Sequence, residues 1–272
     1  MTLADYHVHT AFSIDCDVPM EEQCRAAIAA GVTEIAFTEH VDHDECDAES
    51  RRLYDLPGYS AEVERCRELF DGQLAILRAA EVDWNRSIAG EVMQFLETAE
   101  FDFIIGSVHN LDHTYVGFAT PDDFGGPAEM YDRYYDEMLS LVEAGFPSVI
   151  GHLDLPRRYH GISPIEVDRD HFEGRLREIF RVAARNQVGF EINTSGLNRG
   201  KGFSLPEPEI LGWFVEEGGE VVTVGSDSHR PDHIGGHIQP TFERLNGLGI
   251  DWRTSFVGGH PRKVTVAGVS LL

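Results

Sequence analysis

Short apolar runs alternate with amphipathic stretches along most of this chain. Seven of the runs have the length and composition of buried strands. In chain order they read DYHVHT, EIAFTEH, LAILRAAEVDW, FDFIIGSVH, SVIGHLDL, VGFEINTSG and VVTVGSDSH. Six of them end in a histidine, a carboxylate or both, so polar groups are concentrated where these strands stop.

Helical patterns separate the apolar runs. Apolar residues recur at helical spacing over residues 21–31, 59–70, 91–100, 128–144, 168–186 and 207–217, with a shorter pattern at 241–246. For the first helix, Asp17 is the expected N-cap and Gly31 the expected end. Strands that alternate with helices indicate parallel βαβ units. The pattern therefore predicts an α/β, TIM-like barrel with its active site at the C-terminal ends of the strands.

The 272 residues are expected to form one domain, 1–272, because no repeat, linker or low-complexity tract interrupts the alternation. Two polar stretches, residues 42–57 and 110–127, are long for barrel loops, and the first is expected to fold over the site. A final strand is expected in RKVTVAGV. Tyr131, Tyr134 and Tyr135 fall in a helical pattern and are expected to pack or to form an interface.

The first and last of the seven runs each place two metal-binding side chains two residues apart. These pairs are His7 with His9, and Asp227 with His229. Side chains at alternate positions of a strand lie on one face, so each pair can reach one ion. The first and last strands of a closed barrel are neighbours, and Asp227 is therefore expected to join His7 and His9 on one metal.

The strands between them contribute single candidate ligands. His40, His109 and His152 each close an apolar run, and Glu81 lies within one, where an unpaired carboxylate would be costly to bury. Asp15 follows the first strand and is expected to complete a further site with His40 and His229, although it could instead cap a helix. These groups exceed what one ion requires. We expect two divalent ions, with three fitting best, and their nitrogen and oxygen ligands admit zinc, manganese or iron.

Side chains beyond the presumed ligands can contact a substrate. Arg158 and Arg199 follow strand ends and can each bind two phosphate oxygens, while Lys201 and His43 are weaker candidates. Two further acids are expected to act indirectly. Asp5 could orient a ligating imidazole, and Glu191 could support the site from outside or contact substrate. The remaining histidines, His113 among them, are expected at the surface.

The overall charge limits the classes of partner. The net charge is −25 and no basic stripe is present, which argues against nucleic acid. No apolar run is long enough to cross a bilayer, and no secretory signal is visible, so a cytoplasmic protein without membrane contact is expected. Four cysteines without CxxC spacing suit a reducing compartment and exclude a thiolate zinc site. The oligomeric state is left open.

The ordered motifs DYHVHT, FTEH, EVDW, GSVHN, GHLDL, EINTSGL and GSDSH resemble those of the polymerase and histidinol phosphatase (PHP) family, most closely its stand-alone histidinol-phosphate phosphatase branch. The resemblance runs from Asp5 to about Ile234. It implies a distorted (β/α)7 barrel and a trinuclear site. By motif, the first ion would be held by His7, His9, Glu81 and Asp227, the second by Glu81, His109 and His152, and the third by Asp15, His40 and His229. The arginines after GHLDL and EINTSGL would bind phosphate.

The resemblance implies hydrolysis of L-histidinol phosphate to L-histidinol and phosphate. A metal-bound hydroxide would attack phosphorus, with Glu81 and Asp227 as the catalytic carboxylates. Three alternatives stay open: a phosphatase for another small monoester, an amidohydrolase-type deaminase and a non-catalytic metal-binding module. Binuclear amidohydrolases often need a mid-barrel lysine, and the two lysines here, Lys201 and Lys263, lie in a post-strand loop and in the tail.

Overall fold

The computed structural model describes residues 3–44 and 55–265, and its centre is a seven-stranded parallel sheet curved into a nearly closed barrel. The seven predicted runs form its strands, which confirms the predicted α/β barrel. The strands are β1 (Leu3–Val8), β2 (Val32–Val41), β3 (Ala75–Asp83), β4 (Phe103–Ser107), β7 (Val149–Ile150), β8 (Gly189–Asn193) and β9 (Val222–Gly225). Their order in the sheet is the order of this list.

The first and last strands meet just beyond the end of β1. Val8 and Ser228 form a parallel bridge, in which the amide of His9 donates to the carbonyl of Ser228 at 2.9 Å and the amide of Ser228 donates to the carbonyl of His7 at 3.2 Å. These bonds bring the HxH of the first motif beside the DxH of the last. The two motifs are far apart in the sequence, and backbone hydrogen bonds place them side by side, as expected.

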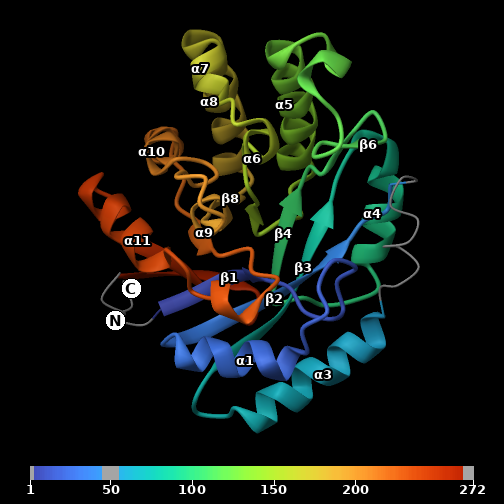
Figure 1. Ribbon diagram of the computed structural model, residues 1–272, viewed down its shortest axis with the longest axis vertical. Coiled ribbons are helices and arrows are strands. Elements are labelled where there is room, and N and C mark those ends of the chain that lie inside the picture. The colour runs from blue at the N-terminus through green and yellow to red at the C-terminus, as the bar shows by residue number, and fades with distance from the viewer. Residues whose placement is uncertain (1–2, 45–54, 266–272) are drawn as a thin grey trace.

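Helices cover the outside of the strands (Figure 1). The longer ones are α1 (Met20–Ala29), α3 (Leu56–Leu69), α4 (Ala89–Leu96), α5 (Pro127–Ala144), α8 (Arg169–Arg185), α10 (Pro208–Glu216) and α11 (Ile238–Gly247). Short α6 (Pro156–His160) and α9 (Ser195–Asn198) follow strand ends, and α7 (Pro164–Val167) comes between α6 and α8. Tyr131, Tyr134 and Tyr135 of α5 are fully buried with Phe172 of α8 in the largest apolar cluster, so they pack as expected. No helix within the described ranges is long and apolar enough to span a membrane.

Several local expectations were wrong. Pro19, not Asp17, occupies the N-cap position of α1, with φ −59° and ψ 143°, and no side chain caps the helix there. The region 110–127 is not a plain loop: it contains the hairpin β5 (Asn110–Leu111) and β6 (Thr114–Tyr115) and a short 3-10 helix, Pro121–Phe124. Residues 45–54, which are most of the first long polar stretch, lie outside the described residues. The expectation that this stretch folds over the site therefore concerns residues outside those described.

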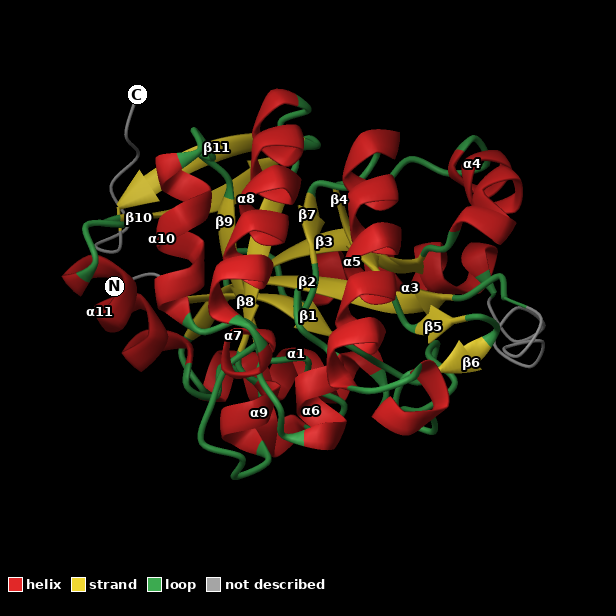
Figure 2. Cartoon of the chain, turned by 90° about the horizontal axis from the view of Figure 1, so that it is seen from above, coloured by secondary structure: helices red, strands yellow, loops and turns green. Residues whose placement is uncertain are grey.

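A second hairpin covers the N-terminal end of the barrel. It consists of β10 (Trp252–Val257), which the sequence pattern did not reveal, and β11 (His260–Thr265), the described part of the expected final strand. Phe256 packs against Tyr6 and Phe103 with ring centroids 5.9 and 4.9 Å apart. The two hairpins lie at opposite sides of the molecule (Figure 2). With this end filled by side chains, the open end is the one where the polar strand ends meet.

Candidate metal centre

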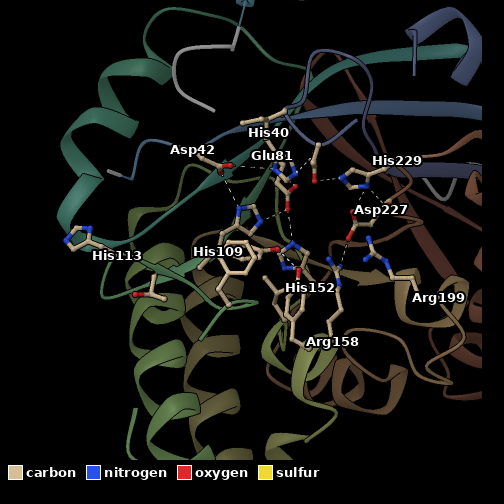
Figure 3. A pocket seen from close by; sticks show the side chains of 17 residues that line it. His40, Asp42, Glu81, His109, His113, His152, Arg158, Arg199, Asp227 and His229 are labelled. Atoms are coloured by element: carbon tan, nitrogen blue, oxygen red, sulfur yellow. Dashed lines mark hydrogen bonds and ion pairs between the residues drawn. The ribbon is translucent and has the colours of Figure 1, made fainter. Parts of the chain in front are cut away.

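The structure brings together all nine side chains that the sequence nominated as metal ligands. Each comes from the C-terminal end of a strand or from the loop that follows it, and the labelled members converge on one region in Figure 3. The nine are His7, His9, Asp15, His40, Glu81, His109, His152, Asp227 and His229. Residues separated by more than 200 positions thus lie within a few ångströms of one another, because parallel strands share one end.

Glu81 lies at the middle of this cluster. Its Oε2 is 3.1 Å from Nε2 of His7 and 3.5 Å from Nε2 of His9. Its other oxygen, Oε1, is 3.2 Å from Nε2 of His109 and 2.8 Å from Nε2 of His152. Asp227 completes the first side, with Oδ1 3.6 Å from Nε2 of His9. The two oxygens of Glu81 therefore face two separate sets of imidazoles.

A third set lies on the solvent side. Asp15 places Oδ1 3.6 Å from Nε2 of His40 and Oδ2 3.0 Å from Nε2 of His229. The ring of His9 packs against both imidazoles, with centroids 4.4 Å from His40 and 4.2 Å from His229. Asp15 is half exposed, whereas Glu81 is buried. This third set is consequently the one most open to solvent.

The donor atoms fit metal ions better than they fit one another. Nε2 of His7, His9 and His229 is buried and makes no hydrogen bond of normal geometry within the described chain, although carboxylate oxygens lie 3.0–3.5 Å away. Two ligands bound to one tetrahedral zinc at about 2.0–2.1 Å are roughly 3.3 Å apart. Four groups of three donors, each within 4.8 Å, occur in the cluster. Spacing, burial and unpaired nitrogens all fit a multinuclear centre.

Two opposing effects set the ionisation of the carboxylates in the cluster. Burial disfavours the charged form, and close contacts with imidazoles and with Arg158 favour it. Burial alone would raise the pKa of Glu81, but the imidazoles of His7, His109 and His40 lower it well below its usual value. Burial likewise disfavours the carboxylate of Asp227, and Arg158 with the histidines lowers its pKa well below the ordinary range. Both carboxylates therefore stay ionised at neutral pH, the state in which they can bind a metal.

Buried acids outside the cluster set the tautomers of its imidazoles. Glu191 accepts a hydrogen bond from Nδ1 of His7 at 2.7 Å, which leaves Nε2 to face Glu81. Ser13 links His9 to Glu39: its hydroxyl donates to Oε2 of Glu39 at 2.6 Å and lies 3.1 Å from Nδ1 of His9. Asp5, expected to orient an imidazole, instead accepts hydrogen bonds from backbone amides, including those of Ser226 and Gly235, and so ties the barrel closure together.

A pocket of about 470 Å³ opens over the cluster, and both candidate arginines line it. Arg158 is buried on α6, contacts Asp227, and lies 3.4 Å from Oδ1 of Asn193. Its Nε makes no hydrogen bond within the described chain. Arg199 is exposed and lines the same pocket as Asp227. A guanidinium at each of these places can bind an anion over the cluster.

Two of the nominated substrate contacts lie elsewhere. Lys201 is exposed and is not among the residues that line the pocket. His43 lines a different pocket and packs against Phe95, with ring centroids 5.6 Å apart. His43 lies beyond Val41, the last residue of β2, and lines that other pocket together with Val41.

Sequence reasoning missed several residues of the site. Asp42 is buried, with Oδ1 3.3 Å from Nδ1 of His109, and one of the donor groups contains it with His40 and His109. The spacing His40-x-Asp42 repeats the two-residue signal of the first and last strands and could have revealed it. Tyr115, Phe118 and His113 also line the pocket. They come from the region taken for a loop, where no pattern pointed to the site.

A parallel barrel with clustered imidazoles and carboxylates at the C-terminal ends of its strands is the architecture of metal-dependent barrel hydrolases. The family model of the PHP domain matches residues 5–195. A histidinol-phosphatase from Lactococcus lactis is 30% identical over 236 residues, which cover 84% of this chain and 85% of that protein. The chain therefore belongs to the PHP domain family.

Two further comparisons agree with this membership. A probable histidinol-phosphatase from Deinococcus radiodurans is 28% identical over 257 residues, covering 91% of this chain and 94% of the relative. The crystal structure of histidinol phosphate phosphatase from L. lactis, complexed with zinc, L-histidinol and phosphate, superposes with a TM-score of 0.83 at 26% identity. That match covers 96% of this chain and 98% of the L. lactis chain.

Proposed function

We propose that this chain is a metal-dependent phosphomonoesterase that hydrolyses L-histidinol phosphate to L-histidinol and inorganic phosphate. The observation that carries the proposal is the convergence of nine candidate metal ligands, seven of which line one pocket of small-molecule size together with Arg158. The L. lactis phosphatase, crystallised with zinc, L-histidinol and phosphate, supports the choice of substrate and the similarity of fold over nearly the full chain.

The cluster would hold two to three divalent ions, with zinc the first choice given the L. lactis complex and manganese or iron as alternatives. His7, His9, Glu81 and Asp227 would hold the first, Glu81, His109 and His152 the second, and Asp15, His40 and His229 the third. Divalent ions in such a site acidify water and neutralise charge on the phosphoryl group. Glu81 would be shared, since its two oxygens face different imidazoles.

The two arginines would position the phosphoryl group. Arg158 is held by Asp227 on one side and lines the pocket, where its guanidinium would donate to a phosphate oxygen. Because the guanidinium is buried, its charge is little screened by solvent and acts strongly on an anion in the pocket. Arg199, on the exposed rim, would close the opposite side. Asp227 would thus serve both sites, because one oxygen faces the imidazoles and the other contacts Arg158.

Pocket size and charge favour a small monoester over a polymer. A volume of about 470 Å³ accommodates a ligand of the size of an amino alcohol phosphate. The acidic balance of the chain, −25, disfavours a polyanionic strand. An amino alcohol with a cationic group is, by contrast, electrostatically compatible with this surface.

The decisive experiment is phosphate release by purified protein loaded with zinc, manganese or iron, with metal content measured by elemental analysis. We expect two to three ions per chain and turnover of L-histidinol phosphate above that of serine phosphate, a hexose phosphate and AMP. Glu81→Gln is expected to lose most of the bound metal and at least about a hundredfold in kcat/KM, since it removes the shared ligand.

Two outcomes would overturn parts of the proposal separately. Brisk turnover of another monoester with none of L-histidinol phosphate would remove the substrate and leave the chemistry. A fully metal-loaded protein that releases phosphate from no monoester would remove the hydrolase and favour a metal-binding module. Asp15→Asn provides an internal control for the ligand sets, because it should lower the metal content by about one ion while the sets around Glu81 remain.

A further inference from the structure

Three aromatic side chains form one continuous wall of the pocket over the metal-ligand cluster. Tyr115 ends β6, Phe118 follows it, and Tyr159 lies on α6. The ring of Tyr115 is 5.2 Å from that of Phe118 and 5.7 Å from that of Tyr159, both edge to face. All three line the same pocket as Arg158 and Arg199. None of them is a metal ligand or a phosphate contact, so the proposed chemistry leaves this wall without a role.

The wall is held rigidly against the cluster. The amide of Val116 donates to the carbonyl of His109 at 2.9 Å, which ties the hairpin to a proposed ligand. The two tyrosine hydroxyls contact each other. Gly117 permits the close approach of the rings, because a Cβ there would lie 2.6 Å from Cε1 of Tyr115 and 2.9 Å from Cε1 of Tyr159. The positions of the rings therefore follow from backbone geometry and packing.

Phe118 is the most exposed large apolar side chain in the described part of the chain. It is 86% exposed, although it continues a packed aromatic pair. Ile14, which is 45% exposed, lines the same pocket. Exposed apolar surface that is contiguous with a polar pocket is the arrangement by which proteins bind the organic part of a ligand.

The wall lies next to the proposed phosphate site. Tyr159 directly follows Arg158 on α6, and the charges of Arg158 and Asp227 act on the hydroxyl of Tyr115. Burial and the neighbouring Tyr159 raise the pKa of Tyr115, so its ring stays neutral at physiological pH. An ester whose phosphoryl group contacts Arg158 would thus present its leaving group near neutral aromatic surfaces.

We propose that Tyr115, Phe118 and Tyr159 form the leaving-group subsite and select phosphomonoesters that carry a flat, cationic or heteroaromatic ring. Aromatic faces attract such rings by offset stacking and by cation–π contact. This inference rests on the proposed phosphatase function and adds which residues choose among its substrates. The amino group and the phosphoryl group are common to many monoesters, and the ring is the part that this wall would recognise.

The test compares two substrates that differ only in the ring. L-Histidinol phosphate and L-alaninol phosphate share the amino group and the alkyl ester, and only the first carries imidazole. For the metal-loaded enzyme we expect Phe118→Ala to lower the ratio of their kcat/KM values about fivefold to tenfold, and Phe118→Leu to lower it almost as much. Val257→Ala removes another exposed apolar side chain, on the far hairpin, and should leave the ratio unchanged. Because Phe118 is exposed, the fold is expected to survive both substitutions.

A second pair of substrates separates failure of the subsite from failure of the proposed function. Benzyl and ethyl phosphate have leaving groups of similar basicity and differ in the ring. If L-histidinol phosphate is not hydrolysed but the benzyl preference depends on Phe118, the subsite stands and the proposed substrate falls. If L-histidinol phosphate is hydrolysed and neither ratio changes in Phe118→Ala or in Gly117→Ala, which displaces the tyrosine rings, the subsite is refuted.

Discussion

Replacing Ser13 by alanine tests whether residues outside the metal-ligand cluster set its donor atoms. The Ser13 hydroxyl has one proton, which it donates to Oε2 of Glu39 at 2.6 Å. The oxygen of the Ser13 hydroxyl also accepts a hydrogen bond from the amide of His40 at 3.1 Å and lies 3.1 Å from Nδ1 of His9. His9 must then carry its proton on Nδ1, which leaves the Nε2 lone pair facing Glu81 and Asp227. Ser13→Ala removes this constraint.

The magnitude follows from the contacts that are lost. Ser13 and His9 are buried, so the variant leaves Nδ1 of His9 and the amide of His40 without this partner, while Oε2 of Glu39 keeps the hydrogen bond from the amide of Thr10. Each such group costs about 1–3 kcal/mol, and we expect the free energy of unfolding of the metal-free protein to fall by roughly 2–4 kcal/mol. Removal of an outer hydrogen-bond partner lowers metal affinity by about 10- to 100-fold. Glu39→Gln should produce a change in the same direction.

The assay is competition for metal with a chromophoric chelator, read beside urea unfolding and the ¹⁵N chemical shifts of the His9 ring. Ser255→Ala is the matched control, because Ser255 also donates to a carboxylate, that of Glu34, at 2.6 Å, but at the opposite end of the barrel. It should affect stability without changing metal affinity. If Ser13→Ala binds metal as tightly as the parent protein and His9 keeps its Nδ1 proton, the reasoning about the tautomer is wrong.

Three other perturbations have defined outcomes. Arg158→Gln should lower kcat/KM for phosphomonoesters about 10- to 100-fold, with partial recovery in Arg158→Lys. A kcat/KM of Arg158→Gln within twofold of that of the parent protein would contradict binding of the phosphoryl group by Arg158. Burial lowers the pKa of His40, but Glu81 and Asp15 outweigh it and raise the value to about 10 in the metal-free protein. Below that pH a metal ion must displace a proton from His40, so the apparent metal affinity should rise from about pH 6.5 towards pH 10. Calorimetry in buffers of different ionisation enthalpy measures the proton release. A metal affinity independent of pH would refute this role of His40. Phe256→Ala should lower the free energy of unfolding, measured in urea, by about 3–5 kcal/mol, because Phe256 is buried against Phe103. It should retain kcat/KM at low temperature, since Phe256 lies at the end of the barrel remote from the pocket. Unchanged stability would show that the hairpin does not seal the core.

The cluster of candidate ligands was predictable because most of its members obey a local rule. His7 and His9 share a strand face at a spacing of two, as Asp227 and His229 do, and His40, His109 and His152 close apolar runs. A parallel barrel then places all strand ends at one rim, whatever their separation in the sequence. Even Asp42, which was missed, follows the same rule from His40. Local periodicity and one topological constraint were sufficient.

Contacts between residues without a shared pattern required the tertiary structure. The contact of Arg158 with Asp227 and the hydrogen bonds that join His9 to Glu39 through Ser13 depend on how loops turn after their strands. The aromatic wall depends on a hairpin in a region with no strand signal. Loop conformation is set by turns and by packing against distant elements, so no periodicity in the chain encodes it.

The sequence by itself thus determined the barrel, the end at which its site lies and the residue types gathered there, because strand and helix periods are local properties. Only the tertiary structure decided which oxygen of Glu81 faces which imidazole, that His43 is directed away from the pocket, and that Tyr115 and Phe118 flank it. Those details depend on side-chain directions and on packing across elements far apart in the chain, which the order of residues constrains only through the complete fold.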